Sequence, residues 1–233
     1  MRVLVTRPLD DALETAAQLS ARGHQSIVAP LLEIQICAEP AFSLDGVQAI
    51  LATSSNGVRA LSQRTDRRDL PLFAVGEHTA TVARGLGFSD VKSANGDVRT
   101  LGAAVSTWAK PQNGTLMHVA GASEPGPLAV DLHVRGYDVQ TAMLYRAVPA
   151  ARLTPVSREA LRKGILDAVL LFSPNTAATF AQCVVAEGLQ NCCRTLIACC
   201  ISEAAATPLK SLGLKDIRWP AHPDQASMLS LLG

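Results

Sequence analysis

Five polar turns carry the residues of this sequence that are best suited to binding chemistry. Each turn follows a short apolar run and precedes a stretch with helical character. Hydroxyls, amides and helix N-termini can bind carboxylates without a large net charge. The turns are Thr6-Arg7-Pro8, Thr53-Ser54-Ser55-Asn56, Gly76-Glu77-His78-Thr79, Ser173-Pro174-Asn175-Thr176 and Ser202-Glu203. Helix capping alone would also explain any single turn, so we expect an anion site where several of them meet.

Other kinds of chemistry have no matching motif. The sequence contains no G-x-x-x-x-G-K-[ST], no H-E-x-x-H and no G-x-S-x-G. The six cysteines lack C-x-x-C spacing and are expected to be reduced core residues, with Cys199 and Cys200 on opposite faces of a strand. The five histidines show no ligand spacing, and His118 is expected in a core or edge strand. We therefore expect no metal and no cofactor.

The composition is that of a globular protein. With 48% hydrophobic and 18% charged residues the chain can bury sizeable cores. Its formal net charge of +1 does not favour a nucleic acid or an anionic membrane as partner. No apolar run reaches the roughly 18 residues of a membrane span, and the N-terminus does not resemble a signal peptide. A cytoplasmic location is expected.

The elements that position the turns are buried strands followed by helices. The helix predicted from residue 10 ends at Gly23, with Leu13, Ala16, Ala17 and either Leu19 or Ser20 on its apolar face. Strands alternating with helices predict an α/β fold with parallel sheets. The predicted strands lie in RVLVTRP, AILATSS, LPLFAVGE, TLMHVAG, DAVLLFSP and TLIACCIS.

Internal echoes indicate two similar domains in permuted order. VGEHTATVARGLGF at 75–88 returns as CISEAAATPLKSLGL at 200–214, with Glu77 and Glu203 in register. LSARGH at 19–24 returns as LHVRGY at 132–137. Two similar domains follow most simply if the N-terminal segment packs with the C-terminal third. One α/β domain is then discontinuous.

The predicted boundaries follow from these echoes. We expect a first domain of residues 1–34 and 150–233 and a second of residues 38–145. Residues 35–37 and 146–149 would form a two-stranded β linker that acts as a hinge, because both connectors combine β-favouring residues with proline. Ligands of open α/β sheets bind beyond the carboxyl ends of the strands, so we expect a cleft beside this hinge.

Six segments in this order resemble the uroporphyrinogen-III synthase family over nearly the whole chain. They are LVTRP, ATSSNGVRAL, AVGEHTATVARGLGF, GYDVQTAMLYRA, LLFSPNTAATF and ISEAAATPLKSLGL. The resemblance implies two α/β domains, the first discontinuous, joined by a two-stranded linker. It also implies that hydroxymethylbilane loses water and closes to uroporphyrinogen III with its last ring inverted, without metal or cofactor.

The resemblance also implies roles for particular residues. Tyr145 would donate a proton or a hydrogen bond to the departing hydroxyl, and Arg7, Thr53 and Ser54 would bind substrate carboxylates. Further substrate-binding residues are expected at Pro8, Ser55, Asn56, Gly76, Glu77, His78, Thr79, Gly121, Ser173, Pro174, Asn175 and Ser202. The chain departs from the family at Ala205, where a threonine is common, and after Gly121, where an arginine is common.

Two other functions fit the same pattern. One is a non-catalytic two-domain protein that binds a tetrapyrrole or another polyanion, and the other is a catalytically inert homologue. For the enzyme, the expected partners are hydroxymethylbilane and, transiently, the preceding bilane-forming enzyme. No nucleic-acid or membrane partner is expected, and the expected oligomeric state is a monomer.

Overall fold

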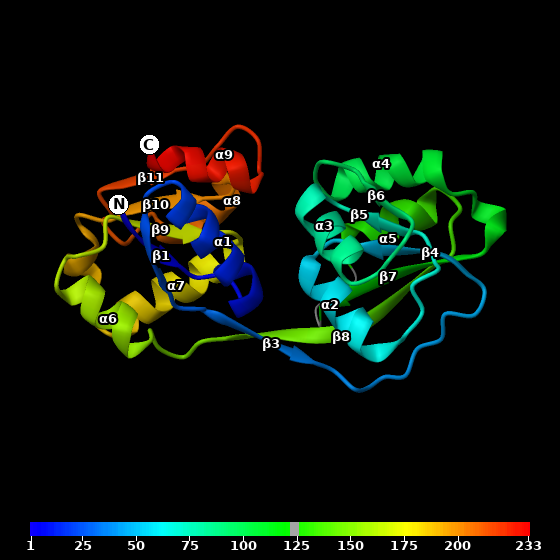
Figure 1. The fold of residues 1–233 in the computed structure, drawn as a ribbon, viewed down its shortest axis with the longest axis horizontal. Coiled ribbons are helices and arrows are strands. Elements are labelled where there is room, and N and C mark those ends of the chain that lie inside the picture. The colour runs from blue at the N-terminus through cyan, green and yellow to red at the C-terminus, as the bar shows by residue number, and fades with distance from the viewer. Residues whose placement is uncertain (122–125) are drawn as a thin grey trace. The chain divides into compact units, whose positions relative to one another are not determined.

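The chain divides into two compact units, each built around its own sheet (Figure 1). The computed structural model describes residues 1–121 and 126–233. Unit 1 comprises Met1–Glu33 and Val148–Gly233, and unit 2 comprises Ile34–Ala147. Figure 1 shows the discontinuity of unit 1, in which the blue N-terminal strand β1 lies beside the yellow strand β9.

Unit 1 contains a five-stranded parallel sheet of order β11-β10-β9-β1-β2. Its strands are β1 (Arg2–Val5), β2 (Gln25–Val28), β9 (Ala168–Leu171), β10 (Ile197–Cys200) and β11 (Asp216–Arg218). Its helices are α1 (Leu9–Ala21), α6 (Pro155–Arg162), α7 (Pro174–Ala186), α8 (Glu203–Ala206) and α9 (Gln225–Leu229), with 3₁₀ turns η2 (Gln190–Cys193), η3 (Thr207–Leu209) and η4 (Ser230–Leu232).

The sheet of unit 2 has the order β3-β8-β7-β4-β5-β6 and is parallel from β8 to β6. Its strands are β3 (Leu32–Ile36), β4 (Val47–Ala52), β5 (Leu72–Ala74), β6 (Val91–Ser93), β7 (Thr115–Gly121) and β8 (Val139–Pro149). Its helices are α2 (Ser55–Arg64), α3 (Glu77–Gly85), α4 (Val98–Trp108) and α5 (Pro127–Val134), with the 3₁₀ turn η1 (Pro111–Asn113).

Both units share one strand order once unit 1 is counted from β9. The order β11-β10-β9-β1-β2 of unit 1 then corresponds to β6-β5-β4-β7-β8 of unit 2. Strand β9 is therefore equivalent to β4, and β1 is equivalent to β7. One sequence echo falls on β5–α3 and β10–α8, and the other on the ends of α1 and α5. The predicted fold class, two similar parallel-sheet α/β domains of which the N-terminal one is discontinuous, is confirmed, and all six predicted strands are present.

The predicted two-stranded linker is also confirmed, because β3 and β8 are neighbours in the sheet. The backbone N–H of Cys37 donates to the carbonyl of Leu144, and that of Ala150 donates to the carbonyl of Leu31. The boundary between the units falls inside both strands, after residue 33 in β3 and after residue 147 in β8. The chain therefore passes from one unit to the other through paired strands.

Each sheet separates two apolar layers. In unit 1, Leu4 and Cys200 belong to one layer, whereas Val5 and Cys199 belong to the other. Alternation along the strands produces this division, and it confirms the opposite orientation predicted for the two adjacent cysteines. The chain has few aromatic residues, so leucine, valine, isoleucine and alanine fill most of these layers.

The predicted apolar face of α1 is wrong except at Leu19, which is buried as expected. Leu13 is 56% exposed, and the other buried positions are Asp11, Ala12 and Thr15. The helix is rotated because Asp11 and Thr15 turn inward to bind the buried guanidinium of Arg7. Its predicted end is correct, since Gly23 has a φ of 77° and closes the helix.

Helix α2 lies unusually close to β7 at Gly57. A Cβ built there would lie 2.9 Å from the backbone carbonyl oxygen of Val119. We expect Gly57→Ala to reduce the free energy of unfolding by about 1–3 kcal/mol, because backbone must move to admit the methyl group. Urea unfolding measures this, with Gly85→Ala as control, since a Cβ at Gly85 meets nothing within 4 Å. Equal stability of the two variants would show that α2 can shift at no cost.

Candidate active site at the carboxyl ends of the strands

Each sheet has one point at which the order of its strands reverses. This point lies between β4 and β7 in unit 2 and between β9 and β1 in unit 1. Ligands of open α/β sheets bind beyond the carboxyl ends of the strands at such a switch point. The turn at 53–56 follows β4, Gly121 is the last residue of β7, and the turns at 173–175 and 6–8 follow β9 and β1. Predicted site residues therefore flank both switch points.

The turn after β4 combines a helix cap with one hydroxyl that is not used for capping. Ser54 is the N-cap of α2, and its hydroxyl accepts a hydrogen bond from the backbone N–H of Asn56 at 3.1 Å. Ser55 is buried in the first turn, and the side-chain oxygen of Asn56 accepts from Arg59. Thr53, directly at the end of the strand, is partly exposed. Thr53 is therefore the side chain of this turn best placed to meet a ligand.

Thr53 has a partner that the sequence did not suggest. Its Oγ1 lies 3.3 Å from Nε2 of His118, across the switch point on β7. His118 is 5% exposed, and this burial lowers the pKa of its imidazole. His118 was predicted to be a core or edge residue of a strand, and the structure places it in the core. The pairing could be found only from the register of β4 against β7, which places Leu51 opposite His118.

The turn after β5 offers backbone donors. Gly76 is the N-cap of α3 and, having no side chain, makes no side-chain cap to the N–H groups of the first turn. The Glu77 carboxylate in this turn would repel a bound anion, but it forms an ion pair with Arg84 at 2.6 Å. Thr79 is buried, and His78 is partly exposed. This geometry is compatible with anion binding at the start of α3.

Tyr145 and Gly121 are in direct contact at the end of β7. They are register partners beside an irregularity of the β7–β8 ladder. A Cβ at Gly121 would lie 3.0 Å from Cε2 and Cζ of Tyr145. Only glycine lets the ring pack this closely on the strand. Within residues 1–121 and 126–233 the phenol has no hydrogen-bond partner. The departure from the family after Gly121 lies outside the described residues.

The predicted serines of unit 1 cap helices. The Ser173 hydroxyl accepts from the backbone N–H of Thr176 at 3.1 Å, and that of Ser202 accepts from Ala205 at 3.4 Å. Pro174 and Asn175 form the first turn of α7, where the Asn175 carbonyl accepts from a threonine one turn later. Their roles in substrate binding stay predictions, since capping already accounts for both hydroxyls.

Arg7 is held inside unit 1. It is 8% exposed, and its guanidinium donates to Asp11 at 2.8 Å, to Thr15 at 3.3 Å and to Gln225 at 2.5 Å. The guanidinium carbon also lies 4.3 Å from the centroid of the Phe172 ring. Two aspartates lie in the first turn of α1 after Pro8. A substrate carboxylate would have to compete with these acceptors, so binding by Arg7 and Pro8 stays a prediction.

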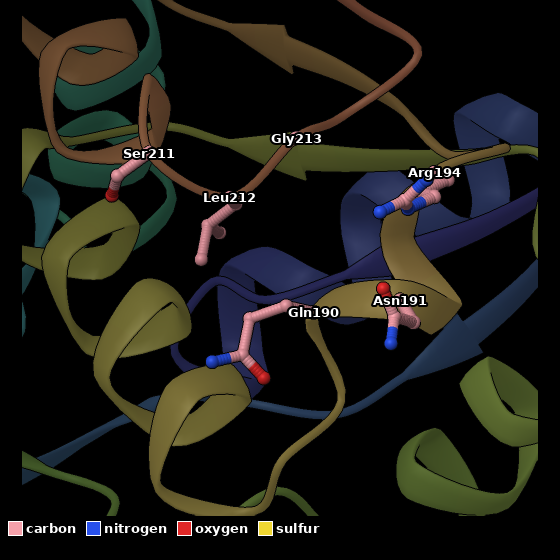
Figure 2. A pocket seen from close by; sticks show the side chains of 6 residues that line it. All are labelled: Gln190, Asn191, Arg194, Ser211, Leu212 and Gly213. Atoms are coloured by element: carbon pink, nitrogen blue, oxygen red, sulfur yellow. The ribbon is translucent and has the colours of Figure 1, made fainter.

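A pocket of about 500 Å³ lies elsewhere in unit 1. Figure 2 shows its lining side chains, which come from the η2 segment and from the loop that leads into β11. They are Gln190, Asn191, Arg194, Ser211, Leu212 and Gly213. Both segments precede a strand, so this pocket lies at the amino ends of β10 and β11. No predicted site residue lines it.

Among the described residues no group of three or more histidine, cysteine or acidic side chains could hold a metal ion. No helix of residues 1–121 and 126–233 is long and apolar enough to cross a membrane.

The cysteines are free thiols and mostly buried. Burial raises the pKa of Cys193 and Cys199 to about 11 and that of Cys200 to about 12. It also raises the pKa of Cys183. These four thiols stay protonated, and hence unreactive, at ordinary pH.

We expect a disulfide reagent at pH 8 to label only the partly exposed Cys37 and Cys192 of the folded protein. All six should react in guanidinium chloride. Counting released chromophore before and after unfolding gives the two numbers. Rapid labelling of more than two thiols in folded protein would mean that the core of unit 1 opens readily.

Comparison with known proteins supports one family. A family model described as Uroporphyrinogen-III synthase HemD matches residues 14–230. A uroporphyrinogen III synthase mutant from the extremely thermophilic bacterium Thermus thermophilus is 20% identical, with a TM-score of 0.55 over 100% of this chain and 97% of that one. Uroporphyrinogen-III synthetase from Helicobacter pylori 26695 is 16% identical, with a TM-score of 0.64 over 100% and 98%. At these identities the solved structures support the fold. The comparison with curated proteins found no significant match.

Proposed function

Because the chain belongs to the uroporphyrinogen-III synthase family, a family of cyclising lyases of tetrapyrrole biosynthesis, we propose which of its groups bind hydroxymethylbilane and promote its closure. The match over residues 14–230 carries the function, since it covers β4, β7 and β9 with the turns that follow β4 and β9, and Tyr145. The reaction removes water from the linear tetrapyrrole and forms a new carbon–carbon bond, giving uroporphyrinogen III with the last ring inverted.

Donors of unit 2 are assigned to the carboxylates of the substrate. Hydroxymethylbilane carries eight carboxylates, so neutral donors at several turns can share its charge. The hydroxyl of Thr53 and the first-turn N–H groups of α3, behind Gly76, are the best placed of them. Helix N-termini favour anions by their dipole, which explains how a chain of net charge +1 can bind a polyanion.

Tyr145 is assigned to the departing hydroxyl group. Its phenol has no partner among the described residues, and its ring is held against Gly121. A hydrogen bond or proton from the phenol would stabilise the hydroxide that leaves the hydroxymethyl carbon. The leaving step produces an electron-poor azafulvene, and the departing group takes up a proton to become water.

Positioning must decide which carbon of the last ring attacks this azafulvene. Attack by the free α-carbon would give the uninverted isomer, which also forms spontaneously. Attack by the substituted α-carbon gives a spiro intermediate, whose opening and reclosure invert the ring. Holding the ring carboxylates at fixed donors would favour the second geometry. The other predicted binding residues, including Ser54, Asn56, Ser173 and Ser202, are assigned to this holding role where their capping bonds permit.

A cytoplasmic location, a monomeric state and transient contact with the preceding bilane-forming enzyme belong to the same proposal. The near-zero net charge, and the absence of a spanning helix from the described residues, support a protein that acts away from membranes and nucleic acid. Sedimentation with and without the bilane-forming enzyme tests the last two points. A stable dimer of this chain alone would contradict the monomer.

Isomer analysis tests the function directly. Freshly made hydroxymethylbilane is incubated with the protein, and the oxidised porphyrins are separated by isomer. We expect type III in excess over the type I product that forms without enzyme. Type I alone from folded protein would contradict the activity, and tight tetrapyrrole binding without turnover would then favour the non-catalytic binding protein or inert homologue.

A further inference from the structure

His118 is a buried polar residue that packing does not explain. It is 5% exposed on β7, and its Nε2 lies 3.3 Å from Thr53 Oγ1. Its other ring nitrogen, Nδ1, is fully buried and has no hydrogen-bond partner among the described residues. Buried polar atoms without partners are costly and therefore uncommon. The free-energy cost of this buried, unpartnered nitrogen indicates that His118 has a functional role.

The other unit shows what packing alone accepts at this position. His118 pairs with Leu51, and Leu51 pairs with Phe73. In unit 1, Val5 pairs with Leu170, which pairs with Cys199, the echo of Phe73. Val5 is therefore the equivalent of His118, and it is fully buried in an apolar layer. An aliphatic side chain fills this position in the same strand order, so the fold does not demand an imidazole.

The unpartnered nitrogen determines the tautomer. A buried N–H without an acceptor is rarer and costlier than a buried lone pair without a donor. If Nδ1 carried the proton, that N–H would be unsatisfied, whereas a proton on Nε2 finds Thr53 Oγ1 as acceptor. The neutral ring with its proton on Nε2 is thus the favoured form. Because burial lowers the pKa of the imidazole, this form prevails at neutral pH.

The tautomer decides what Thr53 can do. A threonine hydroxyl has one proton to donate, and an imidazole acceptor would use it. Nε2–H instead donates to Thr53 Oγ1, so the hydroxyl proton is directed elsewhere. Since Thr53 is partly exposed at the end of β4, that proton can reach a ligand oxygen.

We propose that His118 is a positioning residue, whose Nε2–H holds Thr53 Oγ1 so that the threonine hydroxyl donates to a substrate carboxylate. This inference rests on the proposed function and deepens it by assigning a residue behind the substrate-binding turn. His118 itself touches no substrate. Its effect on catalysis must therefore pass through Thr53, and this dependence makes it testable.

Imidazole nitrogen NMR on the ¹⁵N-labelled, ligand-free protein tests the tautomer without any activity. We expect His118 to show an unprotonated Nδ1 and a protonated Nε2 at neutral pH. His133 is an internal reference of the opposite kind, because its Nδ1 lies 3.0 Å from the carbonyl oxygen of Tyr137 and must donate to it. A protonated Nδ1 at His118 would overturn the proposal.

Steady-state kinetics of isomer III formation test the consequence. Because a hydrogen bond to a charged group is lost or misdirected, we expect His118→Val to raise KM about tenfold with little change in kcat. His118→Gln can still donate from its amide and should retain most of the parent kcat/KM. His133→Gln, in the last turn of α5, should have the kcat and KM of the parent protein.

A double-mutant cycle separates positioning from a purely structural role. In a Thr53→Val background, we expect His118→Val to cause no further loss of kcat/KM. Additive losses, or parent kinetics in His118→Val, would overturn the proposal. Failure of the proposed function itself would be distinct, because the parent protein would then form no type III isomer, while the NMR result would still decide the tautomer.

Discussion

Arg7→Ala is expected to lower the free energy of unfolding of unit 1 by about 3–5 kcal/mol. The guanidinium donates to Asp11, and the two side chains are 9% and 5% exposed. Removing it leaves a carboxylate buried without its countercharge, which costs far more than the pair contributes when intact. The same change takes a donor from Thr15 and Gln225.

Urea unfolding, followed separately for the transitions of the two units if they do not coincide, measures this loss. Lys163→Ala is the matched control, because it breaks an ion pair with Glu159 whose side chains are 62% and 55% exposed. Such exposed pairs contribute about 1 kcal/mol at most. A loss in Arg7→Ala no greater than in this control would show that water or another cation replaces the guanidinium.

A second variant separates stability from substrate binding at Arg7. Replacing the buried pair by apolar residues, Arg7→Met with Asp11→Leu, should recover much of the stability, as buried ion pairs often tolerate such exchange. If this double variant folds and keeps the parent KM, Arg7 acts through the architecture of β1 and α1. A raised KM in folded protein would instead support carboxylate binding by Arg7.

Tyr145→Phe is expected to lower kcat for isomer III formation by about a hundredfold without abolishing it. The change removes only the phenol oxygen, whose hydroxyl has no partner among the described residues. Stability should therefore stay at the parent value. Residual activity is expected because fixed donors still hold the substrate carboxylates and direct the attacking ring.

Tyr137→Phe is the natural control, since these are the only two tyrosines of the sequence. The Tyr137 hydroxyl donates to the carbonyl of Ala109 at 3.0 Å and is buried. Its removal should cost about 1–2 kcal/mol of stability and leave kcat unchanged. The two variants thus have opposite signatures, and an unchanged kcat in Tyr145→Phe would contradict proton or hydrogen-bond donation by Tyr145.

The fold was largely predictable because its signals are local. Short apolar runs ending in polar turns identify β1, β4, β5, β7, β9 and β10 without reference to distant residues. The exposed face of α1 was not predictable in the same way. Its rotation depends on Arg7 binding Asp11 and on Gln225, which lies 218 residues away. The periodic pattern of apolar residues within the helix cannot reveal such a long-range contact.

The position of the candidate site was predictable from the sequence, whereas the roles of its individual side chains were not. Turn chemistry indicated which loops lie at the carboxyl ends of the strands, and strand order puts two such loops at each switch point. Which hydroxyl caps a helix and which faces a ligand depends on backbone angles, as Ser54 and Thr53 show. His118 was foreseen as a core residue, but its bond to Thr53 requires a strand register that no single segment contains.

The permuted strand order has a consequence for synthesis on the ribosome. The strands of the unit 2 sheet all come from the continuous segment 32–149, so this sheet can close soon after residue 149 has emerged. The sheet of unit 1 cannot be completed until β9 has been synthesised, because Val3 in β1 pairs with Ala168 in β9. Contacts of such sequence separation form slowly. The inserted unit can therefore fold first, while the edge of β1 that later pairs with β9 stays open and exposed to aggregation.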